Sequence, residues 1–190
     1  LARCQSVGAR LVVDECFNEF LDDPAAHTMK GRLSGCENLL ILNAFTKIYA
    51  MAGLRLGYCL SDDRALLAAM AEEGPPWPVS QLAQQAGISA LQYAPDWPFR
   101  VRQQLEEERR YLSQELSRLR FHVYPSDSNF LLFQGEEGWR ERLLDRGLLI
   151  RSCADFQGLG PGFYRVCVRS RGENKRLIQA IQQEREAFHG

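Results

Sequence analysis

Three short apolar runs constrain the fold of this chain most strongly. Leu11 to Val13, Leu39 to Leu42 and Leu54 to Leu60 are apolar along most of their length, and they do not alternate with polar residues. Strands that are buried on both faces have this pattern, and such strands are typical of the parallel sheets of α/β proteins. The runs therefore predict an α/β fold, with a mainly parallel sheet and helices packed on it.

Helices are expected between and after these strands. Asp62-Asp63 should cap a helix that ends at Gly74, a second helix is expected over residues 79–91, and Asp96-Trp97-Pro98 is a typical helix start. The long helix that follows has one apolar stripe, and its charged residues, Arg109 among them, are expected on a solvated face. The members of the stripe are Val101, Leu105, Leu112, Leu116 and Leu119.

The texture of the sequence changes after Arg120. Short strands are expected in FHVYPS, NFLLFQ, LLIRSC and FYRVCVR, with one helix over about residues 136–146 and a final helix from Glu173. We therefore expect three parts: residues 1–78 as part of a large α/β domain, residues 79–120 as long connecting helices, and residues 121–190 as a small α+β carboxy-terminal domain.

Composition excludes several classes of function. The net charge of −1 gives no long-range attraction for nucleic acid or anionic lipid. No apolar run approaches the roughly 20 residues that span a bilayer. The six cysteines include no C-x-x-C pair and have no histidine at zinc-ligand spacing, so we expect no metal site and a reduced, cytoplasmic setting. The opening residues, LARCQSVGARLVVDE, are typical of a helix leading into a buried strand, which suggests that a further segment precedes them.

Lys47 is the most unusual residue of the chain. It is the only charged side chain between Glu37 and Arg55, and the chain has three lysines against twenty arginines. One interpretation is a lysine whose stem lies on the core while its amine reaches water. The other is a reactive amine in a partly dry pocket, suited to condensing with a carbonyl. Arg55, which lies between Gly53 and Gly57, either caps a strand or offers a planar two-pronged donor to a phosphate.

The segment AFTKIYAMAGLRLGY resembles the (S/T)-x-(S/T)-K-x-x-x-x-x-G-x-R-x-G-(Y/W) signature of class I/II aminotransferases, which are fold-type I enzymes dependent on pyridoxal 5′-phosphate (PLP). It is most similar to the group that contains threonine-phosphate decarboxylases and histidinol-phosphate aminotransferases. The resemblance implies that Lys47 holds the cofactor, that Thr46 and Arg55 contact it, and that Arg55 binds its phosphate. Residues 1–78 would then belong to the PLP-binding domain. Ala44 departs from the pattern, because this position often carries a phosphate-binding hydroxyl.

Asp14 follows the first apolar run, at the strand end where open α/β sheets place ligands. Taken alone, it is equally typical of a helix cap or an ion-pair partner. The segment DECFNEF is similar to the family's D-E-A-(Y/F)-x-x-F, which makes Asp14 a buried partner of the cofactor's pyridine nitrogen. Phe17 lacks the phenol that many histidinol-phosphate aminotransferases have, which favours the decarboxylases. An apolar run before Asp-Glu is also typical of a Walker B strand, but the sequence contains no G-x-x-x-x-G-K-(S/T).

Arg151 and Arg165 lie in two apolar strands that a glycine-rich loop, residues 158–162, joins into an expected hairpin. Arginines in such strands need an anionic partner, supplied either by a structural salt bridge or by a ligand. The family pattern resembles R-x-(C/S)-x-x-F-x-G-L followed by (F/Y)-R-(V/I)-x-(V/I)-R. It implies that Arg165 binds the substrate α-carboxylate and that Arg151 binds a distal anion. Asn129 matches a family strand start, and it is equally typical of a turn.

The resemblance covers nearly all of this chain but only about half of such an enzyme. It implies a phosphorylated amino acid as substrate, a homodimer for the full-length protein, and cobalamin biosynthesis for the decarboxylase reading. Decarboxylation and transamination both remain open. A second hypothesis is a truncated, non-catalytic fragment whose exposed sheet edge pairs with a partner chain. The three histidines, His27, His122 and His189, are interpreted as solvated or structural.

Overall fold

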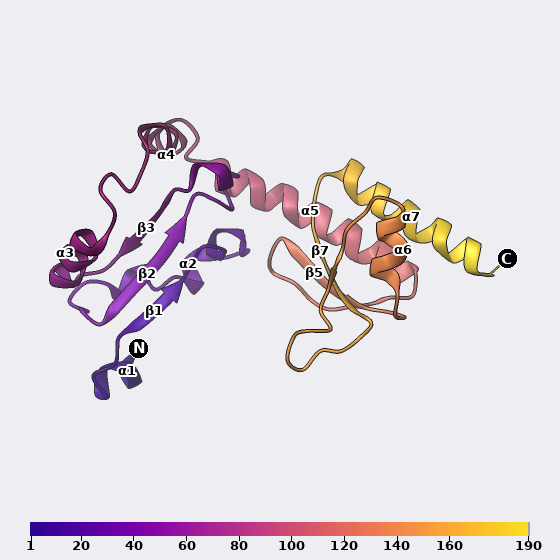
Figure 1. Cartoon of the computed structure of the whole chain (residues 1–190), viewed down its shortest axis with the longest axis horizontal. Coiled ribbons are helices and arrows are strands. Elements are labelled where there is room, and N and C mark those ends of the chain that lie inside the picture. Colours follow the sequence, from indigo (N-terminus) through magenta and orange to yellow (C-terminus); the bar gives the residue numbers. More distant parts are fainter. Residues whose placement is uncertain (190) are drawn as a thin grey trace. The chain divides into compact units, whose positions relative to one another are not determined.

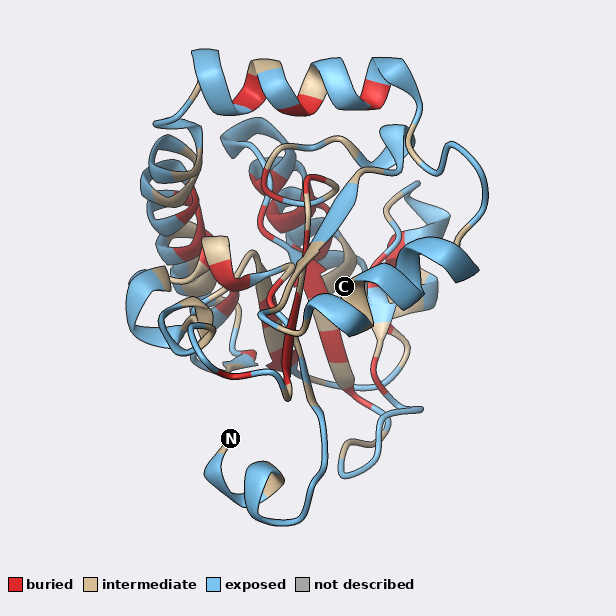
Figure 2. Ribbon diagram, turned by 90° about the vertical axis from the view of Figure 1, so that its left-hand side faces the viewer, coloured by how far each residue is buried: buried red, intermediate tan, exposed pale blue. Residues whose placement is uncertain are grey.

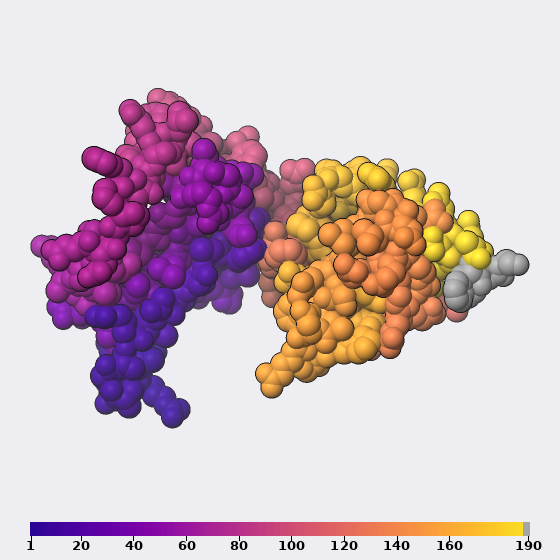
Figure 3. Space-filling view, in the orientation of Figure 1, coloured from indigo at the N-terminus to yellow at the C-terminus, as the bar shows by residue number. Residues whose placement is uncertain are grey.

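A computed structural model describes the backbone of residues 1–189 and the side chains of residues 1–187. The chain forms two compact units, Leu1–Val101 and Arg102–Gly190. The boundary between the two units falls within helix α5 (Trp97–Arg118). Figure 3 shows the atoms of both units, coloured by residue number. The three-part division expected from the sequence stays a prediction.

The first unit is built on a three-stranded sheet in the order β1-β2-β3 (Figure 1). β1 (Leu11–Asp14) pairs parallel with β2 (Leu39–Ala44), as predicted, whereas β3 (Gly57–Leu60) pairs antiparallel with β2. The 3-10 turn η3 (Ala52–Leu54) reverses the chain at the end of β2, so β3 starts at the edge where β2 stops. The remaining elements are α1 (Ala2–Ser6), η1 (Asn18–Phe20), α2 (Pro24–His27), η2 (Lys30–Arg32), α3 (Arg64–Glu73) and α4 (Gln81–Tyr93).

One face of this sheet packs on the segment that joins β1 to β2. Cys36, Leu39 and Ile41 are its buried centre. Leu11 and Val13 of β1 pack against that centre, so Val12 and Asp14 face the other side of the sheet. Helix α3 begins as predicted, because the Asp63 side chain accepts a hydrogen bond from the Leu66 N–H at 2.9 Å.

The second unit is a four-stranded sheet, β4-β5-β7-β6, in which every pairing is antiparallel. Its strands are β4 (His122–Val123), β5 (Phe130–Gln134), β6 (Arg151–Ser152) and β7 (Phe163–Cys167), and its helices are the later part of α5, α6 (Trp139–Asp145) and α7 (Arg171–His189). Leu131 and Phe133 of β5, with Tyr164 and Val166 of β7, turn into the core, so alternate residues of both strands point outward. Figure 2 shows buried positions gathered on the strands and on one side of the helices.

The long helix α5 confirms its predicted apolar stripe in part and corrects the prediction for its charged face. Leu105, Leu112 and Leu116 are buried, whereas Val101 and Leu119 are half-buried. Arg109 was expected in solvent, but it is only 9% exposed and donates a hydrogen bond to the Ser128 carbonyl at 3.2 Å. Burial is tolerated there because the guanidinium has a polar partner inside the unit.

Glu108, the neighbour of Arg109, is also buried within a polar network. Its carboxylate accepts two hydrogen bonds from Arg171 Nε, at 2.8 and 3.1 Å, and one from Asn174 Nδ2 at 2.9 Å. Asn174, only 2% exposed, also exchanges hydrogen bonds with the backbone of Arg169. The network therefore joins α5 to the start of α7 and to the end of the β7 segment. Along residues 1–189, none of the helices has the length and apolar character needed to cross a bilayer.

Candidate active site

Three of the predicted site residues converge on one edge of the first sheet. Asp14 is the last residue of β1, which lies beside Leu42 near the end of the parallel strand β2. Lys47 follows the end of β2 by three residues. Because β3 is antiparallel and Gly57 lies opposite Ala44, Arg55 precedes β3 at this same edge. The topology thus brings a carboxylate, an amine and a guanidinium to the carboxyl ends of β1 and β2.

Asp14 is held by the turn that follows it. Its Oδ1 accepts a hydrogen bond from the Cys16 N–H at 2.9 Å. Hydrogen bonds from the side chain and the backbone of Cys16 hold the pKa of the Asp14 carboxyl below its usual range. Burial, together with the neighbouring Asp14 carboxylate, raises the pKa of the Cys16 thiol to about 11. Asp14 is therefore ionised, and Cys16 stays a neutral thiol.

The expected burial of Asp14 is wrong for this chain. The residue is exposed, because β1 is an edge strand and Asp14 faces away from the packed side of the sheet. Val12, which faces the same way, is 53% exposed. The described residues thus leave this side of β1 uncovered.

Lys47 lies beside the same turn as Asp14. Its Nζ is 5.4 Å from the centroid of the Phe17 ring, three residues after Asp14. The positive charge of Lys47 acts to lower the pKa of the Cys16 thiol, against the larger effects of burial and of the Asp14 carboxylate. Lys47 is exposed, so the partly dry pocket expected from the sequence is not closed by the described residues. Thr46, its neighbour, is half-buried.

Arg55 ends the turn η3 with a left-handed backbone, at φ +54°. Its side chain is exposed, and Nη1 donates a hydrogen bond to the Ala52 carbonyl at 3.3 Å. Gly57, two residues later, permits close strand contact, because a Cβ there would lie 3.1 Å from the Asn43 carbonyl oxygen. The guanidinium therefore stands at the sheet edge without a carboxylate partner among residues 1–187.

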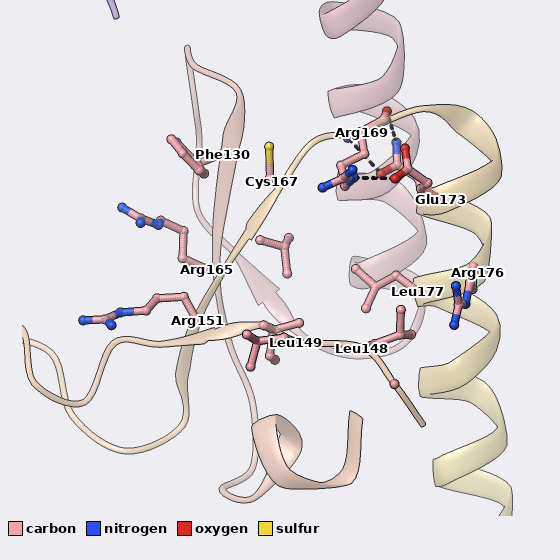
Figure 4. Close-up of a pocket in the computed structure, with 14 residues that line it drawn as sticks. Phe130, Leu148, Leu149, Arg151, Arg165, Cys167, Arg169, Glu173, Arg176 and Leu177 are labelled. Atoms are coloured by element: carbon pink, nitrogen blue, oxygen red, sulfur yellow. Dashed lines mark hydrogen bonds and ion pairs between the residues drawn. The ribbon is translucent and has the colours of Figure 1, made fainter. Parts of the chain in front are cut away.

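In the second unit the predicted arginine hairpin is confirmed. Arg151 of β6 and Arg165 of β7 are direct partners in the antiparallel register. Figure 4 shows both side chains, with that of Phe130, on the same side of the sheet. The Arg165 guanidinium lies 4.5 Å from the centre of the Phe130 ring, and both arginines line a cavity of about 380 Å³. Arg151 also pairs with Asp155, at 2.6 Å between Nη2 and Oδ2.

Asn129 precedes β5 and is half-buried. Its carbonyl accepts a hydrogen bond from the Val168 N–H at 2.8 Å, and its Oδ1 accepts one from the Ser128 hydroxyl at 3.0 Å. Its Nδ2 lies 3.9 Å from the Cys167 sulfur. These contacts hold the turn before β5, beside the strand that carries Arg165.

Sequence reasoning did not single out two neighbours of the arginines. Phe130, in SNFLLF, carries its ring under Arg165, and Asp155 holds Arg151. The outward position of Phe130 follows from the alternation of strand β5, which was a usable signal. Asp155 lies outside the strands, and only the turn geometry brings it back to Arg151. Within the described residues, no group of three or more His, Cys, Asp or Glu side chains is placed to hold a metal ion.

The donors at the first sheet edge suit one kind of cofactor. An amine fits an aldehyde, a carboxylate fits a basic ring nitrogen, and an arginine at a sheet edge fits a phosphate. A PLP-dependent enzyme of fold type I requires this donor set at the edge of an α/β sheet. Solved structures share this fold. The histidinol-phosphate aminotransferase of Clostridium acetobutylicum superposes with a TM-score of 0.88 at 24% identity, covering 98% of this chain and 57% of that one.

The L-threonine-O-3-phosphate decarboxylase of Porphyromonas gingivalis gives a TM-score of 0.78 at 24% identity, over 92% of this chain and 55% of the other. The sequence profile described as "Aminotransferase class I and II" matches residues 1–181. This chain therefore belongs to the class I and II aminotransferase family.

Curated relatives include both enzymes that the sequence suggested. The chain is 38% identical over 184 residues to a threonine-phosphate decarboxylase of Salmonella typhimurium, covering 95% of this chain and 50% of the relative. It is 35% identical over 188 residues to a histidinol-phosphate aminotransferase of Nitratidesulfovibrio vulgaris, covering 96% of this chain and 49% of the relative. The chain thus spans about half the length of the curated relatives that it matches.

Proposed function

We propose that this chain is the carboxy-terminal half of a PLP-dependent enzyme that acts on phosphorylated amino acids, most like an L-threonine-O-3-phosphate decarboxylase. The observation that carries the proposal is the convergence of Asp14, Lys47 and Arg55 on one sheet edge. Membership of the family supports PLP as the cofactor, and the 38% identity to a threonine-phosphate decarboxylase supports the substrate class.

PLP supplies an electron sink for bonds at the α-carbon of an amino acid. Lys47 Nζ would hold its aldehyde carbon and afterwards move a proton as a general base. The Asp14 carboxylate would keep the ring nitrogen protonated, and its lowered pKa suits that task because it stays ionised at neutral pH. Arg55, with Thr46 nearby, would bind the phosphate. Ala44 supplies no hydroxyl there, so the phosphate relies more on Arg55.

The substrate groups are assigned to the second unit. Arg165 is assigned to the α-carboxylate and Arg151 to the distal phosphate, with Asn129 beside them. The cation pair on one face supports an anionic ligand, because like charges directly opposite on neighbouring strands destabilise a sheet and the one carboxylate of Asp155 leaves the pair with a net charge of +1. We assign the full-length protein to the cytoplasm as a homodimer.

Two alternatives stand beside this proposal. A histidinol-phosphate-type aminotransferase is supported by 35% identity to such an enzyme. Phe17, in the position where a phenol is frequent in that group, favours the decarboxylase. The second alternative is a truncated, non-catalytic fragment, which the exposure of Asp14 and Lys47 supports.

Cofactor binding is the first test. Adding PLP to the 190-residue chain should produce an absorbance band at about 420 nm, which marks the covalent link between the aldehyde and a lysine amine. Lys47→Ala should remove the band, and the matched variant Lys175→Ala, at an exposed lysine in the second unit, should keep it. An unchanged band in Lys47→Ala would refute the assignment.

Product analysis separates the reactions. We expect no steady turnover by the 190-residue chain alone, because Asp14, Lys47 and Arg55 are exposed on this chain. Steady turnover of threonine phosphate would contradict that expectation and the fragment alternative. In the full-length protein, release of carbon dioxide from threonine phosphate identifies the decarboxylase, whereas amino transfer from glutamate to a keto acid identifies the aminotransferase.

A further inference from the structure

We propose that Asp155 is a resident counter-ion of the arginine pair, which an anionic ligand must displace and which therefore sets the affinity of that pair for anions. The proposal rests in part on the proposed function, because it takes Arg151 and Arg165 as the anion site. Asp155 would act through Arg151, as a positioning and affinity-determining residue.

The two arginines differ in their surroundings. They are register partners on the outer face of the sheet, yet Arg151 alone has a carboxylate, that of Asp155, at 2.6 Å. Among residues 1–187 no carboxylate forms an ion pair with Arg165, which instead lies over the Phe130 ring. Without ligand, Asp155 thus supplies the negative charge that keeps two like charges tolerable side by side.

The turn after β6 places Asp155 there. The Cys153 N–H donates to the Phe163 carbonyl at 2.8 Å, and the Phe156 N–H donates to the Cys153 carbonyl at 3.0 Å. Cys153 is only 2% exposed, so the turn is anchored in the core. The Phe156 ring centre, from the same turn, lies 5.6 Å from the Arg151 guanidinium. Arg151 is therefore held between two residues of one anchored turn.

This ion pair is easily exchanged, because it lies in solvent. The side chains of Arg151 and Asp155 are 53% and 65% exposed. Residues 154–158 are all exposed, and the loop between β6 and β7 protrudes from the second unit in Figure 3. A free anion reaches Arg151 without opening the core. Asp155 thus competes with the anionic ligand for Arg151.

Charge arithmetic gives the size of the effect. Arg151, Arg165 and Asp155 together carry a net charge of +1, and the two arginines without Asp155 carry +2. One unit charge at about 6 Å in a water-like dielectric changes the affinity of a monoanion about threefold and that of a dianion about tenfold. Asp155 therefore weakens phosphate binding more than acetate binding, and its removal should sharpen the preference for the dianion.

The test is a titration of the 190-residue chain at pH 8 and constant ionic strength with inorganic phosphate and, separately, with acetate. Binding is followed by the Nε–H resonances of the arginines. Asp155→Asn keeps the size of the side chain and removes its charge. Glu141→Gln is the matched control, because Glu141 is an exposed acid that pairs with Arg140 at 3.1 Å and lines the same neighbouring cavity as Asp155.

We expect Asp155→Asn to tighten phosphate binding about tenfold and acetate binding about threefold, and Glu141→Gln to change both less than twofold. Equal or weaker phosphate binding in Asp155→Asn overturns the proposal, because a residue that only shapes the turn gives that result. Absence of phosphate binding in every variant overturns it too. Asp155→Asn could tighten anion binding as expected while the chain with Lys47 intact shows no absorbance band after PLP is added. In that case the cofactor assignment fails and the role of Asp155 stands.

Discussion

The sharpest stability prediction concerns Gly162, which immediately precedes strand β7. Gly162 has a φ of +87°, and a Cβ added there would lie 2.5 Å from the Gly135 carbonyl oxygen. Gly158, in the same loop, has a φ of +85° but would meet nothing within 4 Å. The two positions therefore share the backbone cost of a positive φ, and only Gly162 adds a collision with backbone.

The two substitutions to alanine should differ by about 2–4 kcal/mol in the free energy of unfolding. A positive φ costs an L-residue about 1–2 kcal/mol, which is the whole effect expected for Gly158→Ala. Gly162→Ala adds about 1–3 kcal/mol of overpacking. It also strains the hydrogen bond that the Gly135 N–H donates to the Gly162 carbonyl at 3.0 Å, and such a bond contributes about 1 kcal/mol. We expect a loss of about 3–6 kcal/mol for Gly162→Ala.

Urea unfolding followed by tryptophan fluorescence measures this difference in the second unit of the chain, which contains both glycines. Of the three tryptophans, Trp139 is 1% exposed, Trp97 is 37% exposed and Trp77 is 92% exposed, so unfolding changes the surroundings of Trp139, in the core around α6, the most. If Gly162→Ala unfolds within about 1 kcal/mol of Gly158→Ala, the reasoning from the 2.5 Å contact is refuted.

Two further predictions concern other sites. Glu108→Gln should lower the free energy of unfolding by about 2 kcal/mol in a urea titration, because it removes the charge that accepts from Arg171 and Asn174. Glu106→Gln, which breaks an exposed pair, should cost less than about 0.5 kcal/mol, and equal losses would contradict the burial argument. At pH 8 iodoacetamide should alkylate Cys16 about 100-fold more slowly than an ordinary thiol, because a pKa of about 11 leaves little thiolate. Asp14→Asn should lower the pKa of the Cys16 thiol and speed its alkylation, which mass spectrometry measures. An unchanged rate would count against the interaction between Asp14 and the Cys16 thiol.

The sequence predicted strands well where burial dictates residue type. Leu11 to Val13 and Leu39 to Leu42 form a parallel pair as predicted. The expected burial on both faces holds for β2, whereas in β1 the side chain of Val12 is 53% exposed. The same pattern carries no information on direction, so the antiparallel pairing of β3 depended on the turn η3 instead. Helix α6 begins three residues later than about residue 136, because Gly138 adopts a left-handed N-cap.

Charged residues were harder to place from the sequence. Arg109 has the neighbours of a surface residue along the helix, and only the tertiary contact with Ser128 explains its burial. Asp14 was expected inside because motif spacing gives the strand end but not what covers it. The convergence of Asp14, Lys47 and Arg55 was predictable, since it follows from strand ends and from one turn. The pairing of Arg151 with Asp155 was not, because it depends on a turn outside the strands.

The central claim is that Lys47, among three lysines, is the one that binds PLP. The most direct measurement is to add PLP to the chain, reduce with borohydride and locate the added mass by peptide mapping. We predict that the modification lies on Lys47 at one cofactor per chain, with Lys30 and Lys175 unmodified. Equal labelling of the three lysines, or labelling that spares Lys47, would contradict the account.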